Sequence, residues 1–235
     1  MRAVALPDFP WDSIAADKAV AAAHVDGIVD LSIGTPVDPV PAAVRAALAG
    51  PAAAEPGYPT THGSAELRGA IAGSLERRFG VTVDPAAVLP TIGSKELVAW
   101  LPTLLGLGPG DTVVLPELAY PTYEVGALLA RASFLRSDTP AEGARLIWLN
   151  SPSNPTGRVL SADHLREVVE SARRHGAVVA SDECYLSLAG DSGAVSVLHP
   201  DVCGGSHEGL LAVHSMSKSS NLAGYRAGFV AGDPA

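Results

Sequence analysis

The chain contains few cysteines, few aromatic residues and few charged residues for its length. Of its 235 residues, two are cysteines, 5% are aromatic and 17% are charged. The two thiols, Cys184 and Cys203, do not have the spacing of metal ligands, which argues against a zinc site built on cysteine. We expect both thiols to be reduced, as they are in a cytoplasmic protein.

The sequence also lacks basic clusters and long apolar runs. It has 16 Lys and Arg against 25 Asp and Glu, a net charge of -9, which argues against nucleic acid or an anionic membrane as a partner. No apolar run reaches the roughly 20 residues of a membrane span, and the start, residues 1–8, is broken too early for a signal peptide. With 47% hydrophobic residues, the chain can build a sizeable core.

Apolar strands alternate with helices from residue 87 onward. We predict strands at 87–91, 112–115, 133–135, 146–149, 177–180, 209–214 and 226–230, and helices at 64–79, 94–105, 120–130 and 162–175. Before these lie helices at 12–23 and 41–48 and a short strand near residue 31. The alternation indicates an α/β domain with a mostly parallel sheet. Ligands of such sheets bind at the carboxyl ends of the strands.

The most distinctive stretch follows the apolar run at 209–214. Ser215, Ser217 and Lys218 come directly after it, and Arg226 follows. A lysine can form a Schiff base with a carbonyl, while hydroxyls and a guanidinium hold a phosphate. Pyridoxal phosphate (PLP) carries both groups. A solvated serine-rich turn is the plainer interpretation of this stretch alone.

A serine-acylating enzyme is a second interpretation of the same residues. The stretch from Ser215 to Lys218 matches S-x-x-K, the acylating motif of penicillin-binding proteins. The companion motifs are missing, because no K-T-G occurs and Ser181-Asp182 is followed by Glu183 in place of asparagine. The sequence therefore gives little support to this alternative.

Polar motifs follow other predicted strands as well. Gly93-Ser94-Lys95-Glu96 opens a helix, whose free backbone N–H groups can bind phosphate, although ordinary capping by Ser94 is also consistent. Asn154 lies between two prolines that fix the backbone and can aim its amide, as can happen in any polar turn.

Two further motifs suit a heteroaromatic ring. Asp182 and Tyr185 follow the strand at 177–180, and an acid beside a pyridine nitrogen keeps that nitrogen protonated. Tyr120 follows the strand at 112–115, where it can stack on a flat ring or fill the core. A solvated acid is the usual role of a lone aspartate on a loop.

Together, the lysine stretch, Asn154-Pro155-Thr156-Gly157 and Asp182-Glu183-Cys184-Tyr185 resemble the class I/II aminotransferases of PLP fold type I. The matches run in family order from Ile33 to Gly228. The resemblance implies a large domain with a mostly parallel sheet flanked by helices, and a small domain. It implies that residues 1–40 form an N-terminal arm with part of the small domain, and that residues 41–235 form the PLP-binding large domain.

The resemblance also implies roles for the residues around the cofactor ring. By this analogy Lys218 binds the cofactor covalently and shuttles the proton. Asp182 pairs with the pyridine nitrogen, Tyr185 and Asn154 hydrogen-bond the ring hydroxyl oxygen, and Tyr120 stacks on the ring. The family pattern has a cis peptide at Asn154–Pro155, which we expect here too.

The same analogy assigns the phosphate and substrate contacts. The phosphate is surrounded by the motif beginning at Gly93, by Ser94 and Lys95 through backbone groups, and by Ser215, Ser217 and Arg226. Tyr58 reaches the phosphate of the neighbouring subunit, which implies a homodimer. Gly34 meets the substrate carboxylate through its N–H.

Within the family, residues 6–12, 57–61 and 116–126 resemble the succinyldiaminopimelate aminotransferases of actinobacteria. That implies exchange of an amino group between N-succinyl-LL-2,6-diaminopimelate and 2-oxoglutarate in lysine and diaminopimelate biosynthesis. The family pattern continues past residue 235 with the rest of the small domain, including an arginine that grips the substrate carboxylate. We therefore expect the chain to be C-terminally truncated and a poor enzyme alone. Another aminotransferase substrate, or a non-catalytic PLP-binding fragment, remains the alternative.

Overall fold

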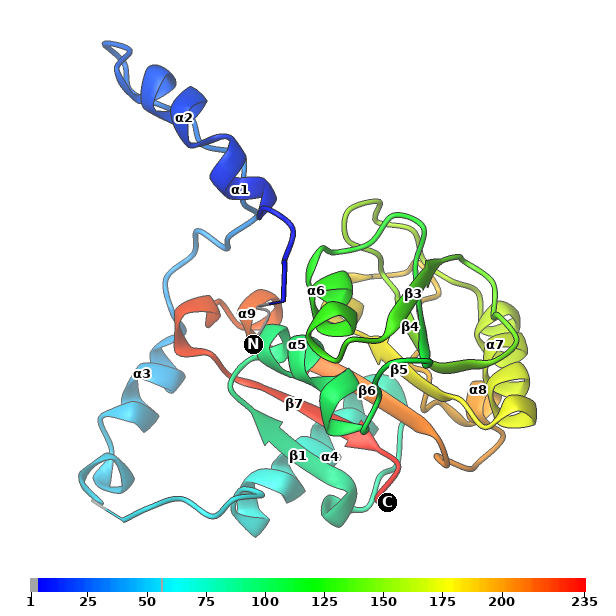
Figure 1. The fold of residues 1–235 in the computed structure, drawn as a ribbon. Helices are drawn as coiled ribbons and strands as arrows, with labels where there is room; N and C mark the ends of the chain where they lie inside the picture. Colours follow the sequence, from blue (N-terminus) through cyan, green and yellow to red (C-terminus); the bar gives the residue numbers. More distant parts are fainter. Residues whose placement is uncertain (1–3, 56) are drawn as a thin grey trace.

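A single seven-stranded sheet organises the computed structural model, which describes residues 4–55 and 57–235. The strand order is β1-β7-β6-β5-β4-β2-β3 (Figure 1). The strands are β1 (Val88–Thr91), β2 (Thr112–Leu115), β3 (Ser133–Arg136), β4 (Ala144–Asn150), β5 (Val178–Asp182), β6 (Leu210–Ser215) and β7 (Gly228–Gly232).

The sheet is mostly parallel, as predicted. Strands β3, β2, β4, β5 and β6 pair in parallel with their neighbours. Only β7 is reversed, and it pairs antiparallel with β6 on one side and β1 on the other. The carboxyl ends of β1, β4, β5 and β6 therefore meet at one edge of the sheet, together with the start of β7.

Helices cover both faces of the sheet. One core packs α4 (Ala65–Phe79) and α7 (Ala162–His175) against one face, and a second core packs α5 (Ser94–Leu104) and α6 (Thr122–Leu129) against the other. Strand β4 contributes to both because successive side chains alternate: Ile147 and Leu149 join the first core, and Leu146 and Trp148 the second. The shorter helical elements are η1 (Pro51–Ala54), η2 (Pro85–Ala87), η3 (Leu186–Leu188), α8 (Pro200–Cys203), α9 (Met216–Ser219) and η4 (Ala223–Tyr225).

Helix α4 begins and ends where its sequence predicts. The Ser64 hydroxyl accepts a hydrogen bond from the Leu67 N–H at 3.1 Å, which satisfies one free donor of the first turn. Gly80 ends the helix in the left-handed conformation, with φ 66°, which glycine adopts without steric cost. Local chemistry alone therefore sets the boundaries of this helix.

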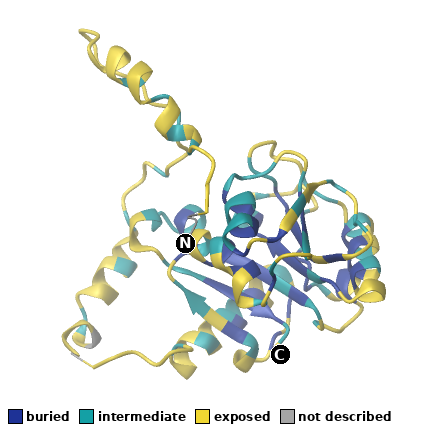
Figure 2. Ribbon diagram, viewed as in Figure 1, coloured by how far each residue is buried: buried dark blue, intermediate teal, exposed yellow. Residues whose placement is uncertain are grey.

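The N-terminal segment lies apart from the sheet. It contains α1 (Pro10–Ser13), α2 (Ala15–Ala22) and α3 (Ala42–Leu48), none of which has a buried residue. Figure 1 shows α1 and α2 projecting away from the sheet, and Figure 2 shows this segment largely exposed. The division into an arm of residues 1–40 and a large domain stays a prediction.

Two strand predictions were wrong. Residues 24–40 contain no strand, and Leu31 and Ile33 are exposed, because no other described strand lies beside them to complete a hydrogen-bonded ladder. The last strand begins at Gly228, because Arg226 adopts a left-handed conformation with φ 53° that an extended strand does not allow.

None of the helices in the described part of the chain combines the length and the hydropathy that crossing a membrane requires.

Helix α4 provides a test of the core. Replacing Leu75, which is 1% exposed, by alanine should lower the free energy of unfolding by about 2–5 kcal/mol because a cavity forms. Leu67→Ala on the same helix is the control, because Leu67 is 46% exposed and should cost much less. Denaturant unfolding of both variants measures the difference, and equal costs would contradict the packing described here.

Candidate functional site

Polar residues end several neighbouring strands at one edge of the sheet. Asn150, the last residue of β4, pairs with Asp182, the last residue of β5. Asp182 pairs in turn with Val213 of β6, and Ser215 at the end of β6 pairs with Gly228 at the start of β7. The register thus brings together motifs that are far apart in the sequence.

A cavity of about 430 Å³ opens at this edge. Trp11, Tyr123 and Cys184 contribute to its wall. Its lining also includes most of the residues predicted from the sequence: Gly34, Ser94, Lys95, Tyr120, Asn154, Asp182, Tyr185, Ser215, Ser217, Lys218 and Arg226. The structure therefore gathers these motifs around one space, while their individual roles stay predictions.

Lys218 is presented by a short helical turn, α9. The Ser215 side chain accepts a hydrogen bond from the Ser217 N–H at 3.1 Å and so fixes the start of this turn. The Lys218 amine donates a hydrogen bond to the carbonyl of Gly34, which comes from the N-terminal segment. A primary amine is thus held inside the cavity, where a carbonyl compound can reach it.

Asp182 lies at the bottom of the cavity. It is 8% exposed, and its carboxyl accepts hydrogen bonds from the Tyr123 hydroxyl at 2.8 Å and from the Cys184 N–H at 3.1 Å. Burial raises the pKa of Asp182, and these two donors oppose the rise because they stabilise the carboxylate. A cationic or N–H-bearing ligand in the cavity would favour the charged form further.

The loop after β4 is held from its own strand. The Asn150 side chain donates to the Asp182 carbonyl at 2.9 Å and accepts the Asn154 N–H at 2.7 Å. The peptide bond between Asn154 and Pro155 is cis, which confirms the prediction, and Ser151–Pro152 is cis as well. Asn150 therefore links the two loops that carry Asn154 and Asp182.

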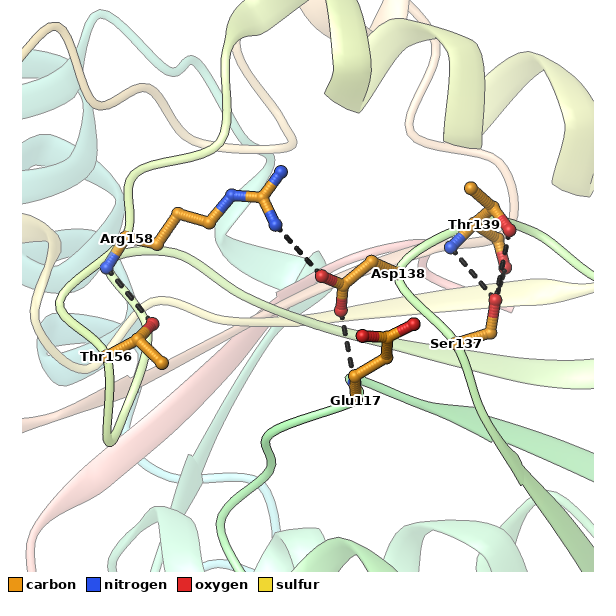
Figure 3. Close-up of polar contacts among 6 residues, drawn as sticks. All are labelled: Glu117, Ser137, Asp138, Thr139, Thr156 and Arg158. Atoms are coloured by element: carbon orange, nitrogen blue, oxygen red, sulfur yellow. Dashed lines mark hydrogen bonds and ion pairs between the residues drawn. The ribbon is translucent and has the colours of Figure 1, made fainter.

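Asp138, which does not line the cavity, binds two loops of the site (Figure 3). One carboxylate oxygen accepts the Glu117 N–H at 3.1 Å, and the other pairs with the Arg158 guanidinium at 2.9 Å. Glu117 belongs to the loop that carries Tyr120, and the Arg158 carbonyl accepts the N–H of Ser153 at 2.9 Å. The loops of Tyr120 and Asn154 are thus tied to one carboxylate.

An anion-binding cradle forms where α5 begins. Gly93 has φ 73°, and a Cβ there would collide with the Arg226 guanidinium. A Cβ on Gly228 would lie 3.1 Å from the Ser94 nitrogen. The two glycines therefore let a guanidinium and the free N–H groups of a helix start approach the same place, which suits a phosphate.

Cys184 joins this cradle through Ser94. Its thiol donates to the Ser94 hydroxyl at 3.2 Å. Burial raises the pKa of the Cys184 thiol well above its usual range, so the group keeps its proton and remains a donor. This contact connects the segment after β5 to the start of α5.

Not every predicted site residue contributes its side chain to the cavity. Tyr58 is fully exposed and does not line the cavity, so its role toward a neighbouring subunit stays a prediction. The Lys95 ammonium lies 4.2 Å from the centroid of the Phe9 ring, which leaves only its backbone for the phosphate. Gly93 shapes the cradle without lining the cavity, and Tyr185 does line it, half-buried.

Sequence reasoning gave no site role to several residues of the cavity lining, among them Tyr123, Trp11 and Cys184. Tyr123 lies in the first turn of α6, and its direction depends on the rotation of this helix, which the sequence pattern does not specify. Trp11 is brought in by the N-terminal segment, where its indole N–H donates to the Ser32 carbonyl at 3.2 Å. Cys184 belongs to the Asp182–Tyr185 motif, but the sequence pattern gives its thiol no role at the site.

The donor set fits PLP. Lys218 supplies an amine for the aldehyde, Asp182 a buried acid for the ring nitrogen, and Asn154 an amide beside it. The α5 N-terminus and Arg226 supply a cradle that a Cβ at Gly93 would fill. A second cavity of about 290 Å³, on the α7 side of β4, is lined by residues such as Leu149, Leu160 and Val168 and has no lysine in its lining.

Comparisons with known proteins agree with this arrangement. A family model described as aminotransferase class I and II matches residues 26–235. The probable aminotransferase Rv1178 of Mycobacterium tuberculosis is 64% identical over 97% of this chain and 56% of its own length. The 4-dedimethylamino-4-oxo-anhydrotetracycline transaminase OxyQ of Streptomyces rimosus is 58% identical over 98% of this chain and 65% of its own length.

A solved structure has the same fold. The probable N-succinyldiaminopimelate aminotransferase of Thermus thermophilus superimposes with a TM-score of 0.81 at 35% identity, over 95% of this chain and 64% of that one. The chain thus spans less than two thirds of the length of these relatives.

The Tyr123 hydroxyl can be tested by its removal. Tyr123→Phe should lower the free energy of unfolding at pH 7 by about 1–3 kcal/mol, because a buried carboxylate loses a donor. The raised pKa of Asp182 means that its charged form costs stability above that pKa, and the lost donor adds to the cost of this form alone. The deficit should therefore shrink as the pH falls through the pKa of Asp182.

Tyr120→Phe is the matched control, since the Tyr120 hydroxyl has no hydrogen-bond partner within the described part of the chain. Thermal or denaturant unfolding at several pH values measures both variants. A Tyr123→Phe deficit that is the same at every pH would show that the hydroxyl does not act through the carboxylate.

Proposed function

The chain belongs to the class I and II aminotransferase family, which depends on PLP, and from this premise we propose that the protein transfers an amino group from an amino acid to a 2-oxo acid. The observation that carries the proposal is the shared cavity, which joins the Lys218 amine, the buried Asp182 carboxyl and an anion cradle at the start of α5.

The residues divide the work of holding the cofactor. Arg226 and the N–H groups at the start of α5 would hold its phosphate, and Tyr120 and Asn154 would position its ring. When bound, PLP supplies an electron-withdrawing ring that accepts electrons from a carbon losing its proton. The Asp182 carboxylate favours this by pairing with the protonated ring nitrogen.

Lys218 would transfer the proton. Its Nζ lies in the cavity and donates a hydrogen bond to the Gly34 carbonyl. With PLP bound, the Lys218 amine would act as the base that takes a proton from the substrate carbon and as the acid that gives it back. The same residue would serve both half-reactions, so we expect ping-pong kinetics.

For the substrate we propose N-succinyl-LL-2,6-diaminopimelate with 2-oxoglutarate as acceptor. The support is the resemblance of residues 6–12, 57–61 and 116–126 to actinobacterial succinyldiaminopimelate aminotransferases, and the name of the Thermus thermophilus relative. A homodimer is proposed as well, with Tyr58 reaching the neighbouring phosphate from its exposed position.

A second candidate substrate is a polycyclic ketone. It is favoured by the 58% identity to OxyQ, whose name describes an oxo-anhydrotetracycline as its substrate. Both candidates share the amino transfer and differ only in the carbonyl compound.

Covalent attachment of the cofactor tests the lysine. After incubation with PLP and reduction by borohydride, peptide mapping should place the pyridoxyl group on Lys218, because this amine lies in the cavity. Lys218→Arg should abolish the labelling, while Lys95→Arg, whose ammonium lies against the Phe9 ring, should retain it. Labelling at another residue of the folded protein would remove the basis of the mechanism.

Amino-group transfer is tested by a half-reaction. Glutamate added to the PLP-loaded protein should shift the cofactor spectrum to the pyridoxamine form and release an equivalent of 2-oxoglutarate, since a transaminase completes one half-reaction without a second substrate. Donors to be compared are glutamate, N-succinyl-LL-2,6-diaminopimelate and alanine. An unchanged spectrum with all donors would indicate a non-catalytic PLP-binding protein.

The carbonyl acceptor decides between the two candidate substrates. The pyridoxamine form should be reoxidised by N-succinyl-2-amino-6-oxopimelate faster than by an anhydrotetracycline ketone. The reverse order would favour the polycyclic candidate. Labelling of Ser215 by a β-lactam would support the serine-acylating alternative.

A further inference from the structure

Glu183 and His214 form a buried carboxyl–imidazole pair outside the cavity. The side chain of Glu183 is 1% exposed and that of His214 is 7% exposed, and Glu183 Oε2 lies 3.3 Å from His214 Nε2. The contact has the length of an ion pair without the angles of a hydrogen bond, and neither atom has another partner among the described residues. The other oxygen of Glu183 accepts the Val197 N–H at 2.7 Å.

His214 is also held between two aromatic rings. Its ring stacks on Phe229 of β7 at 4.8 Å and on Phe79 of α4 at 5.8 Å, measured between ring centroids. An imidazolium over aromatic faces is favoured by their negative quadrupoles. The stacking therefore fixes the orientation of the His214 ring between β7 and α4.

The charged and titratable groups around His214 come from three elements. Arg78 of α4 lines the same small pocket, Glu183 and Cys184 come from the segment after β5, and Asp182 ends β5 on the opposite face of the sheet. Strand β7 contributes only the Phe229 ring to this pocket. Within this group, Glu183 is the acid in contact with His214.

Neither charge can be buried alone. A carboxylate or an imidazolium without a partner in an apolar interior costs several kcal/mol, and the pair persists because each charge offsets the other. One oxygen of Glu183 already accepts the Val197 N–H, which leaves the other oxygen for His214.

The pair lies directly behind the cofactor-binding edge. Glu183 follows Asp182, and its N–H donates to the Val213 carbonyl at 2.8 Å, which extends the β5–β6 ladder. His214 precedes Ser215, the residue that caps the Lys218 turn. Because strand side chains alternate, the Glu183–His214 pair occupies the α4 face while Asp182 and Ser215 occupy the cavity face.

We propose that Glu183 and His214 are positioning residues for the cofactor: their buried ion pair fixes the ends of β5 and β6 and places a positive charge behind the Asp182 carboxylate. The inference rests on the proposed function in taking PLP as the ligand. Neither residue touches the cavity. They act through Asp182, whose pKa burial raises and whose charged form the His214 charge favours.

Two isosteric substitutions separate charge from shape. Glu183→Gln keeps an oxygen for the Val197 N–H and removes the negative charge. His214→Phe keeps an aromatic ring between Phe79 and Phe229 and removes the positive charge. The double variant removes both charges and keeps both shapes, and so guards against a single variant that fails to fold.

The first measurement is unfolding of the chain without cofactor. Each single variant should be less stable than the parent, because one buried charge is left uncompensated. The double variant should be more stable than the sum of the two single effects predicts. Additive effects of the two substitutions would overturn the ion pair.

The second measurement is PLP affinity by absorbance titration. His214→Phe and the double variant should both bind PLP about 3- to 10-fold more weakly than the parent, because the Asp182 carboxylate loses a nearby positive charge. A purely structural pair predicts instead that the double variant regains parental affinity along with its stability. That result would overturn the positioning role.

An Asp182→Asn background supplies the decisive control. If His214 acts through the Asp182 charge, His214→Phe should have little further effect on PLP affinity once that charge is absent. An equal loss in both backgrounds would show that His214 acts by another route and would overturn the inference. A parent that binds no PLP would overturn the proposed function and the cofactor role of the pair, while the unfolding cycle would still decide whether the ion pair exists.

Discussion

The buried carboxyl of Asp182 is the group on which the rest of the site depends. An acid in an apolar interior keeps its charge only where donors and positive charge surround it, and the neighbouring elements supply these. Tyr123 of α6 and the Cys184 N–H donate to its oxygens, and Asn150 donates to its backbone carbonyl. The contacts from Tyr123 and Asn150 join β5 to α6 and to β4. The contacts that stabilise this carboxylate therefore also assemble the site.

The register of the sheet brings motifs that are distant in the sequence to one edge. Because β4, β5 and β6 are parallel neighbours, their last residues end at one edge without long loops. The reversal of β7 brings its first residue to the same edge, and Gly228 pairs there with both Ser215 and Thr91. The glycine at this position lets the α5 start come close to the Lys218 turn. A side chain at position 228 would push apart the amine and the anion cradle.

Much of this could be predicted from sequence, and the failures have physical causes. Apolar runs located every strand of the sheet, and polar residues after those runs located the site, because burial and strand ends are local signals. The Tyr123–Asp182 contact was missed because it depends on the rotation of α6 about its axis, which the pattern does not specify. The strand near residue 31 was wrong because a strand needs a neighbour, and hydrophobicity alone does not supply one. Arg226 was placed on a strand because a run of residues does not reveal a left-handed backbone.

The two faces of the sheet contribute different charged groups to the site. The cavity face presents groups that must meet a ligand, and so it cannot also surround Asp182 completely with protein charges. The opposite face has no such restriction, and there Glu183 and His214 lie among Phe79, Phe229 and the core residues of α4. Strand alternation couples the two, since the residue after Asp182 and the residue before Ser215 must point to the far face. A charge on that face acts through the thickness of one sheet, where little water screens it, and leaves the cavity free for the ligand.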